Sequence, residues 1–413
     1  MSLREHVIAK IEELYPLVIQ FATQQKSETY PISIFEGKPG AALFFYQYAH
    51  FKKEKQQKCY ALINTLIDDA FEYIASTPDI RTSYCDGIIG ILWMIQFFRN
   101  EGVIHMDADE IEQEIIQELS SFSISQTVNQ VNCDFLHGGF GFWAFLLEFK
   151  DLSGKERLIR SQLDALTRIT LKTEHGINWR TDLDIFQKNE TNKIVIDSLN
   201  STHLGMAHGI SIIVVLLAKT KMQGFFEKEI DKMIRGAMSH IYSLKFSVPL
   251  TSCYPMVVVN GKAEQGGRLA WCNGDLSVAN AYWFAWKATK ESSYKKEALR
   301  ILHFVKSMDR KYSGVMDAGL CHGAAGVAQQ FRQFFWETGD EEFLKTSDKW
   351  IQIALEMANY KDGYAGYKTY SSNAYGGPRL EHGFLSGICG IGTALLSSLS
   401  KNPTTWDRAL QIC

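Results

Sequence analysis

The 413-residue sequence has no strong excess of charge of either sign. It contains 43 lysines and arginines against 46 aspartates and glutamates, which leaves a formal net charge of −3. Proteins whose main partner is nucleic acid usually carry a concentrated positive charge. The charge balance therefore gives no reason to expect nucleic-acid binding.

A membrane-spanning run and an export signal are also missing. The longest uncharged run, from Phe384 to Ser400, is rich in glycine and serine and falls just short of a membrane span. The N-terminal segment Met1–Ala22 carries charges within an apolar pattern of helical spacing, which is typical of an amphipathic helix and not of a signal peptide. We therefore predict a cytoplasmic protein without a transmembrane segment, and leave peripheral attachment to the inner face of the membrane open.

Proline and strand-like segments are scarce, whereas glycine is abundant. There are 8 prolines and 31 glycines. The best strand candidates, Lys193–Ile196 and Met256–Val259, both lie in connections between helical segments. Apolar residues make up 46% of the chain and charged residues 22%, which is typical of a globular protein and excludes a disordered one. The composition predicts a folded and mainly helical chain.

The glycines recur in seven turns that resemble Gly-x-x-Gly, and each turn opens a mostly apolar stretch. A charged amphipathic segment precedes every turn. A helix that is apolar on all sides lies inside a protein. Each repeat unit is therefore predicted to consist of an outer amphipathic helix, a turn and a buried inner helix. The first glycines are Gly37, Gly87, Gly138, Gly209, Gly274, Gly323 and Gly387. The second glycine is replaced by Ile212 in the fourth turn and by Ser277 in the fifth.

Seven such hairpins predict an all-α fold, the α/α toroid or double α-barrel, in which a ring of outer helices surrounds a ring of inner ones. An open solenoid would need polar capping units at its ends, and none is evident. Length alone suggests two or three domains. The repeat instead predicts one domain over residues 1–413. We call the alignment of the seven turns the repeat frame.

The residues just before each first glycine would meet at one end of a closed ring. The fifth and sixth units place Cys272 and Cys321 at the same position of the repeat frame, and His322 follows Cys321 directly. Two thiolates and an imidazole are a common zinc ligand set, and three protein ligands leave a fourth position for water or substrate. No CxxC pair is present, so a zinc finger has no support. The pattern predicts one catalytic Zn²⁺.

Three further polar residues lie close to these turns. His208 immediately precedes the fourth first glycine, Asp134 lies in an apolar context before the third, and Arg268 precedes Cys272 by four residues. Each also has an ordinary structural alternative. His208 could be a hydrogen-bonded lining histidine, Asp134 a carboxylate that forms a turn, and Arg268 a surface cation. Cys85 shares the frame position but lies three units from Cys272, and we predict it to be a packed cysteine. The same is predicted for Cys59, Cys133, Cys253, Cys389 and Cys413.

Three segments of the sequence carry a resemblance to a known family. Trp271-Cys272-Asn273-Gly274, Cys321-His322-Gly323 and Gly205-Met206-Ala207-His208-Gly209 resemble the signature of the lanthionine synthetase C-like proteins, the lantibiotic cyclases. The resemblance covers the chain from about Phe35 to Leu396. It implies seven glycine-rich helical repeats in a double α-barrel with a catalytic zinc.

The resemblance also implies roles for individual residues. His208 would act as acid or base, with Asp134 and Arg268 as supporting active-site residues. One position departs from the pattern: many bacterial cyclases have tyrosine after the first zinc cysteine, where this chain has Asn273. A role of that tyrosine is therefore not transferred. The implied zinc ligands are Cys272, Cys321 and His322.

The family reaction adds a cysteine thiol to a dehydroalanine or dehydrobutyrine of the same peptide and forms a lanthionine or methyllanthionine ring. The resemblance thus implies a zinc-dependent lanthionine synthetase acting on a dehydrated precursor peptide, with a lanthipeptide dehydratase and an export transporter as expected partners. One alternative is a related zinc protein that adds or binds a small thiol such as glutathione, or a non-catalytic zinc scaffold. Another is a different enzyme on an α/α barrel, such as a glycoside hydrolase with paired carboxylates.

Overall fold

A computed structural model describes every residue of the chain except 25–31, 78–79, 106–109, 130–132, 180–200, 264, 374–375 and 413. The described residues form fourteen α-helices and a few short strands, so the predicted all-α class is confirmed. Contacts divide the chain into two units. Unit 1 comprises Met1–His105 and Val315–Cys413, and unit 2 comprises Met106–Gly314. One domain over residues 1–413 stays a prediction.

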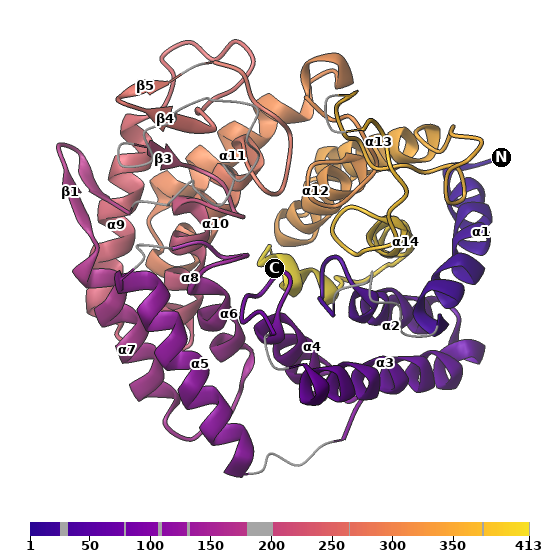
Figure 1. Ribbon diagram of the computed structural model, residues 1–413. Helices are drawn as coiled ribbons and strands as arrows, with labels where there is room; N and C mark the ends of the chain where they lie inside the picture. The colour runs from indigo at the N-terminus through magenta and orange to yellow at the C-terminus, as the bar shows by residue number, and fades with distance from the viewer. Residues whose placement is uncertain are drawn as a thin grey trace. The chain divides into compact units, whose positions relative to one another are not determined.

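Unit 1 contains the first four and the last three helices (Figure 1). They are α1 (Leu3–Thr23), α2 (Ala41–Phe51), α3 (Gln56–Ser76), α4 (Ile88–Asn100), α12 (Ala324–Thr338), α13 (Glu341–Glu356) and α14 (Ile388–Ser398). Helix α1 begins with a capping box, in which Ser2 Oγ accepts from Glu5 N at 3.3 Å and Ser2 N donates to Glu5 Oε2 at 2.7 Å. These two bonds satisfy backbone donors that a helix start leaves open.

Unit 2 contains the seven helices between them and five short strands. The helices are α5 (Glu110–Asn129), α6 (Phe140–Glu148), α7 (Lys155–Arg168), α8 (Ile210–Met222), α9 (Glu227–Ser243), α10 (Asp275–Thr289) and α11 (Ser292–Lys306). Strands β1 (Leu171–Thr173) and β2 (Gly176–Asn178) form an antiparallel pair. Strands β3 (Ser201–His203), β4 (Val257–Val259) and β5 (Lys262–Ala263) form an antiparallel sheet in that order.

The strand predictions fare unevenly. Strand β4 falls within the predicted Met256–Val259, whereas Lys193–Ile196 lies outside the described residues. The other four strands were not predicted. They are only two or three residues long, so their sequences are too short to show an alternating pattern.

The predicted alternation of outer and inner helices is present. All nine residues of α6 are buried, as expected of an inner helix. Helix α9 instead buries one stripe at helical spacing, which is typical of an outer helix. The stripe consists of Ile230, Met233, Ile234, Ala237, Met238 and Ile241, with His240 beside it.

The second glycine of the turn is required by a close backbone contact. In four turns it lies against the carbonyl oxygen of the residue six positions earlier, where a Cβ would approach that oxygen to between 1.8 and 2.3 Å. The pairs are Gly40 with Ile34, Gly90 with Tyr84, Gly326 with Leu320, and Gly390 with Phe384. In the fifth turn Ser277 replaces the glycine, and its Oγ donates to the equivalent carbonyl of Trp271 at 2.8 Å. A hydrogen bond therefore takes the place of the backbone contact there.

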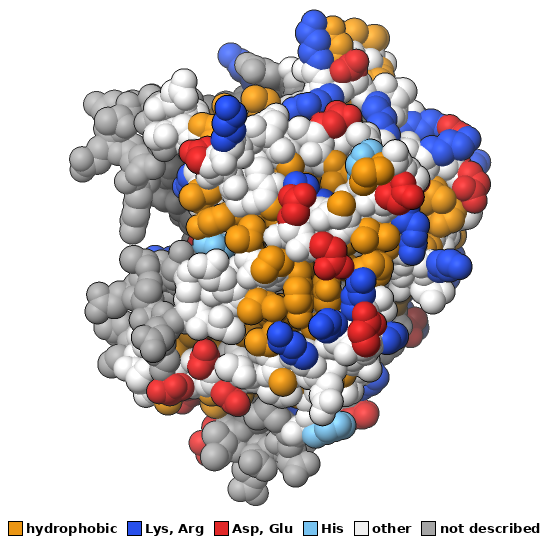
Figure 2. Space-filling model, turned by 90° about the vertical axis from the view of Figure 1, so that its right-hand side faces the viewer, with side chains coloured by type: hydrophobic (Ala, Val, Ile, Leu, Met, Phe, Trp, Pro, Cys, Tyr) orange, Lys and Arg blue, Asp and Glu red, His pale blue; other side chains and the backbone are white. Residues whose placement is uncertain are grey.

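The surface shows no sector of a single charge sign on the face drawn in Figure 2, as far as its residues are described. Basic and acidic side chains alternate there around a gathering of apolar ones. This agrees with the nearly balanced charge of the sequence. Among the described residues, no helix is both long and apolar enough to cross a membrane.

Candidate metal centre

The fourth and fifth turns are packed together within unit 2. The backbone N–H of Ala207 donates to the carbonyl oxygen of Cys272 at 3.2 Å. Gly205 makes this approach possible, because a Cβ at that position would lie only 2.2 Å from the same oxygen. The turn that carries His208 is thereby attached to the backbone of the turn that carries Cys272.

His208 and Asp134 are in direct contact. The Oδ2 atom of Asp134 contacts Nδ1 of His208, and its Oδ1 atom accepts from His137 N at 2.6 Å. The Asp134 side chain is fully buried, while that of His208 is 20% exposed. The carboxylate thus both closes its own turn and orients the imidazole. Because Nδ1 is engaged, a proton transfer by His208 would use Nε2.

Two more histidines lie near this pair. The rings of His137 and His208 are nearly parallel, with centroids 6.1 Å apart. His203 ends strand β3, and burial lowers its pKa to about 4; a charge on His208 lowers it further, and Asp134 opposes the shift. His203 is therefore neutral at neutral pH. Sequence reasoning missed it, because its position five residues before His208 has no place in the repeat frame.

Arg268 lies in the segment that leads to Cys272. Gly314 packs against it, since a Cβ there would be 3.4 Å from the Cα, Cβ and Cγ atoms of Arg268. The next residue, Leu269, donates its N–H to Ser313 O at 2.8 Å. Arg268 is half-buried as a residue, and its guanidinium makes no hydrogen bond or ion pair with another described residue. It therefore retains its donors for a ligand.

Asn273 and Asp275 shape the fifth turn. The Oδ1 atom of Asn273 accepts from Gly274 N at 2.9 Å, and Gly274 has a φ of +99°, a region that favours glycine. The buried carboxylate of Asp275 accepts from the N–H groups of Cys253 at 2.8 Å and Tyr254 at 3.0 Å. Burial raises the pKa of Asp275 to about 6, although these two hydrogen bonds oppose the shift. The start of α10 is thus tied to the preceding connection.

In unit 1 the sixth turn is organised by Asp317, a residue that sequence reasoning missed. Its buried carboxylate accepts from Gly319 N at 3.0 Å and from Tyr370 N at 2.9 Å. Its Oδ2 atom also lies 3.6 Å from Nε2 of His322. Carboxylates commonly orient metal-binding histidines in this way. The signal in the sequence was a single acidic residue five positions before His322.

Backbone contacts also hold Cys321 in place. The N–H groups of Leu320 and Cys321 both donate to the carbonyl oxygen of Leu385, at 2.9 and 3.0 Å. The seventh turn is linked onward in the same unit, because Leu385 N donates to Phe35 O at 3.0 Å. Neighbouring turns of unit 1 are therefore joined by the same kind of bond as the fourth and fifth turns of unit 2.

Exposure separates two cysteines from the others that the structure describes. Cys272 and Cys321 are partly exposed, whereas the remaining described cysteines are buried, as predicted for packed residues. Burial raises the pKa of the Cys59 thiol to about 11 and that of Cys253 to about 12. Such thiols stay protonated and unreactive. The buried set is Cys59, Cys85, Cys133, Cys253 and Cys389, and Cys413 lies outside the described residues.

Each of the three predicted ligands has a donor atom of the kind that binds metal ions, Cys272 in unit 2 and Cys321 and His322 in unit 1. Cys272, Cys321 and His322 each offer one ligand atom, and all three side chains are partly exposed. Two thiolates and an imidazole are donors that suit Zn²⁺. A carboxylate near the histidine, as Asp317 provides, also fits such a site. The donor set is therefore compatible with zinc.

The fold and these residues define an all-α protein of repeated hairpins that carries two partly exposed cysteines and a histidine with metal-binding donors. The family model described as lanthionine synthetase C-like protein matches residues 28–411, and the chain belongs to that family. Among solved structures, the chain is similar to a nisin cyclase, with 17% sequence identity over 97% of each chain and a TM-score of 0.71. This likeness confirms the predicted α/α toroid of seven hairpins. No curated protein matches the sequence.

Proposed function

We propose that this protein is a zinc-dependent lanthionine synthetase, which closes thioether rings in a dehydrated precursor peptide. The observation that carries the proposal is the exposure of Cys272 and Cys321, the two partly exposed cysteines among those described, within a chain of the lanthionine synthetase C-like family. The fold that the chain shares with a protein named nisin cyclase supports the same activity.

The sulfur atoms of Cys272 and Cys321 and one ring nitrogen of His322 would hold the zinc. When bound, the ion supplies the Lewis acidity that makes a substrate thiol, with an ordinary pKa of about 8.5, a thiolate at neutral pH. Two protein thiolates already balance the double positive charge of the ion, which suits a substrate thiolate that must remain nucleophilic. Asp317 would keep the His322 ring in one orientation.

His208 is the residue we assign to protonation of the substrate. Addition of the thiolate to the β-carbon forms the C–S bond and places negative charge on the α-carbon and its carbonyl oxygen. His208 would deliver a proton to that α-carbon from Nε2, because its Nδ1 is engaged by Asp134. The thiol proton goes to solvent and one proton reaches carbon, so the addition is balanced.

Arg268 would stabilise the enolate that precedes protonation. A guanidinium that makes no ion pair with a described residue can donate to a developing oxyanion without first losing a partner. Asp134 would hold the His208 ring in one orientation through Nδ1. His203, which is neutral at neutral pH, would not compete with His208 for the proton.

The proposal is tested with zinc-loaded protein and a synthetic dehydrated peptide that contains one cysteine. Ring formation leaves the mass unchanged but removes the thiol, so it is measured by loss of alkylation in a mass spectrum. Cys272→Ala and Cys321→Ala should lose both bound zinc and ring formation. Cys85→Ala, at the same position of the repeat frame but buried, is the matched control and should retain both.

Each other outcome points to a different function. Normal ring formation by either zinc-site variant would contradict the mechanism. Bound zinc without turnover would favour a scaffold, and addition of glutathione in place of ring closure would favour a small-thiol enzyme. A dehydratase must act before a cyclase of this kind, since the acceptor is a dehydrated residue. In this proposal, dehydration and ring closure take place in the cytoplasm, and an export transporter acts on the modified peptide afterwards.

A further inference from the structure

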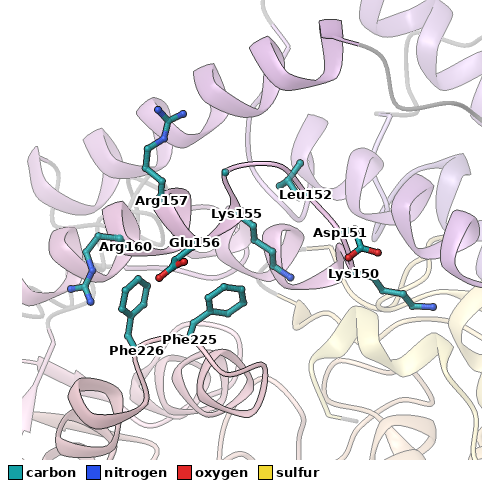
Figure 3. Close-up of a pocket in the computed structure, with 10 residues that line it drawn as sticks. Lys150, Asp151, Leu152, Lys155, Glu156, Arg157, Arg160, Phe225 and Phe226 are labelled. Atoms are coloured by element: carbon teal, nitrogen blue, oxygen red, sulfur yellow. The ribbon is translucent and has the colours of Figure 1, made fainter.

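A pocket of about 710 Å³ lies in unit 2 where helix α7 begins (Figure 3). Helix α8 starts directly after the turn that carries His208 and ends at Met222, three residues before Phe225 in the pocket wall. Thirteen helical residues span about 20 Å. The pocket therefore lies at the opposite end of α8 from the His208–Asp134 pair and is separate from it.

The wall of the pocket includes a buried ammonium group. Lys155 is only 7% exposed, and its Nζ donates to the carbonyl oxygen of Phe149 and to Gln223 Oε1. Neither acceptor is charged, and no carboxylate within the described residues forms an ion pair with Lys155. An ammonium has three protons to donate, and burying a charge without a counter-charge is costly. Burial lowers the pKa of Lys155 to about 8, although the negative charge of Asp151 opposes the shift.

Two other cations of the wall also form no ion pair with a described carboxylate. Arg157 is exposed and donates to the neutral amide oxygen of Gln117 at 3.2 Å. Lys150 is exposed and makes no hydrogen bond or ion pair with a described residue. Arg160 differs, because it is paired with Asp164 at 3.2 Å and Glu229 at 2.7 Å. Three of the four cations thus remain available to an anionic ligand.

Aromatic rings supply the apolar part of the wall. The guanidinium of Arg160 lies 3.8 Å from the centre of the Phe226 ring, and the Lys155 ammonium lies 5.6 Å from that of Phe225. Figure 3 shows both phenylalanines beneath the basic side chains. Ligand pockets typically combine apolar surface with a few polar groups that fix orientation, and this one is of their usual size.

The distribution of charge favours a peptide over a compact polyanion. Asp151 and Glu156 also line the pocket, so four positive and two negative side chains leave a net charge of +2. A phosphate group would be repelled by the two carboxylates between the cations. Single carboxylates spaced along a chain, with apolar side chains between them, match both the separated cations and the rings.

We propose that this pocket binds an acidic peptide segment, with carboxylates at Lys155 and Arg157 and an apolar side chain against Phe225 and Phe226. The site needs neither the zinc ligands nor His208. It would hold a peptide segment at the far end of α8, about 20 Å from His208.

The test measures fluorescence anisotropy of a labelled octapeptide that alternates glutamate and leucine. A second peptide, with glutamine in place of glutamate, is its neutral match. The full-length protein should bind the acidic peptide at least about tenfold more tightly, and binding should weaken as NaCl rises from about 50 to about 300 mM. Equal binding of the two peptides, or displacement by inorganic phosphate at the concentration of the peptide, would overturn the proposal.

Substitutions locate the binding. Arg157→Gln and Lys150→Gln, both at exposed positions, should each weaken binding several-fold without affecting the fold. Lys228→Gln, on the exposed surface of α9 and outside the pocket wall, is the control and should leave it unchanged. The proposal is wrong if the pocket variants bind like the control. Cys272→Ala should still bind the acidic peptide, so a failure here is distinguishable from a failure of the proposed cyclase activity.

A spectroscopic measurement on Lys155 provides an independent readout. The Nζ titration of this residue, followed by ¹⁵N NMR, should move to higher pH when the acidic peptide is bound and not when the glutamine peptide is added. A bound carboxylate favours the charged ammonium. Absence of any shift at saturating acidic peptide would place the peptide elsewhere on the protein.

Discussion

The backbone N–H of Ala207 donates to the carbonyl oxygen of Cys272 across 3.2 Å. Ala207 immediately precedes His208, so this bond links the residue proposed to protonate the substrate with a proposed zinc ligand through the backbone alone. Backbone contacts vary less than contacts between long side chains. The relative position of the two groups is therefore set by the glycine turns of unit 2.

The first prediction concerns Gly205→Ala. The new Cβ would lie 2.2 Å from the Cys272 oxygen, so the two turns must separate. We expect a loss of about 2 kcal/mol in the free energy of unfolding and a larger proportional loss of ring formation. Urea unfolding and the alkylation assay measure the two effects. Gly339→Ala is the control: its Cβ would meet nothing within 4 Å, but the φ of +72° makes alanine strained there, so this variant should lose unfolding free energy and still keep full activity.

The second prediction concerns Asp134→Asn. The amide oxygen can still accept from His137 N, so the turn should fold, but the negative charge beside His208 is lost. We expect bound zinc to remain and turnover to fall by about 10²-fold or more, the usual contribution of a positioned acid or base. Zinc content and kcat are measured on the same sample. Full turnover by this variant would show that the charge of Asp134 is not needed for protonation of the substrate.

The third prediction concerns Asp317→Asn. Its amide can keep one backbone contact but provides no charge to Nε2 of His322. Loss of a carboxylate behind a metal-binding histidine typically weakens metal binding about 10–100-fold. Competition with a chelator of known affinity measures the change. Unfolding of the zinc-free protein separates a metal effect from simple loss of stability, and unchanged zinc affinity would remove Asp317 from the site.

The fourth prediction is a pH dependence of stability that arises from His382. This ring stacks on Phe21 at 4.4 Å and contacts Tyr364 at 4.1 Å between centroids, and burial lowers its pKa from 6.5 to about 4. The unfolded chain then binds the proton more tightly than the folded one. Stability from this residue is therefore complete above about pH 6.5 and is lost as the pH falls toward 4.

The variant His382→Phe should flatten that dependence. Between pH 7 and pH 4.5 we expect the original protein to lose about 2 kcal/mol more unfolding free energy than the variant. Urea unfolding at the two pH values gives the comparison. His303→Phe is a surface control, since that residue lies on outer helix α11. Identical pH dependence of the original and His382→Phe proteins would show that the ring is not held neutral.

Much of the fold was predictable because its signal repeats. Each inner helix is apolar on all sides and each outer helix has one apolar stripe, and both patterns depend only on nearby residues. The candidate ligands were visible for the same reason, since Cys272 and Cys321 occupy equivalent positions of the repeat frame. Their assigned chemistry, and the roles of His208, Asp134 and Arg268, stay predictions that the experiments above address.

The sequence by itself determined the helical hairpins, the seven turns and the residue types available for a metal. Only the tertiary structure decided which side chains meet. His203 and Asp317 were invisible in the repeat frame, because their partners His208, Tyr370 and His322 are brought near by turn closure and by packing of distant segments. The short strands depended on pairing in the same way, and the basic pocket depended on α7 meeting the chain after α8. Contacts of this kind arise from burial and backbone closure, which local periodicity does not encode.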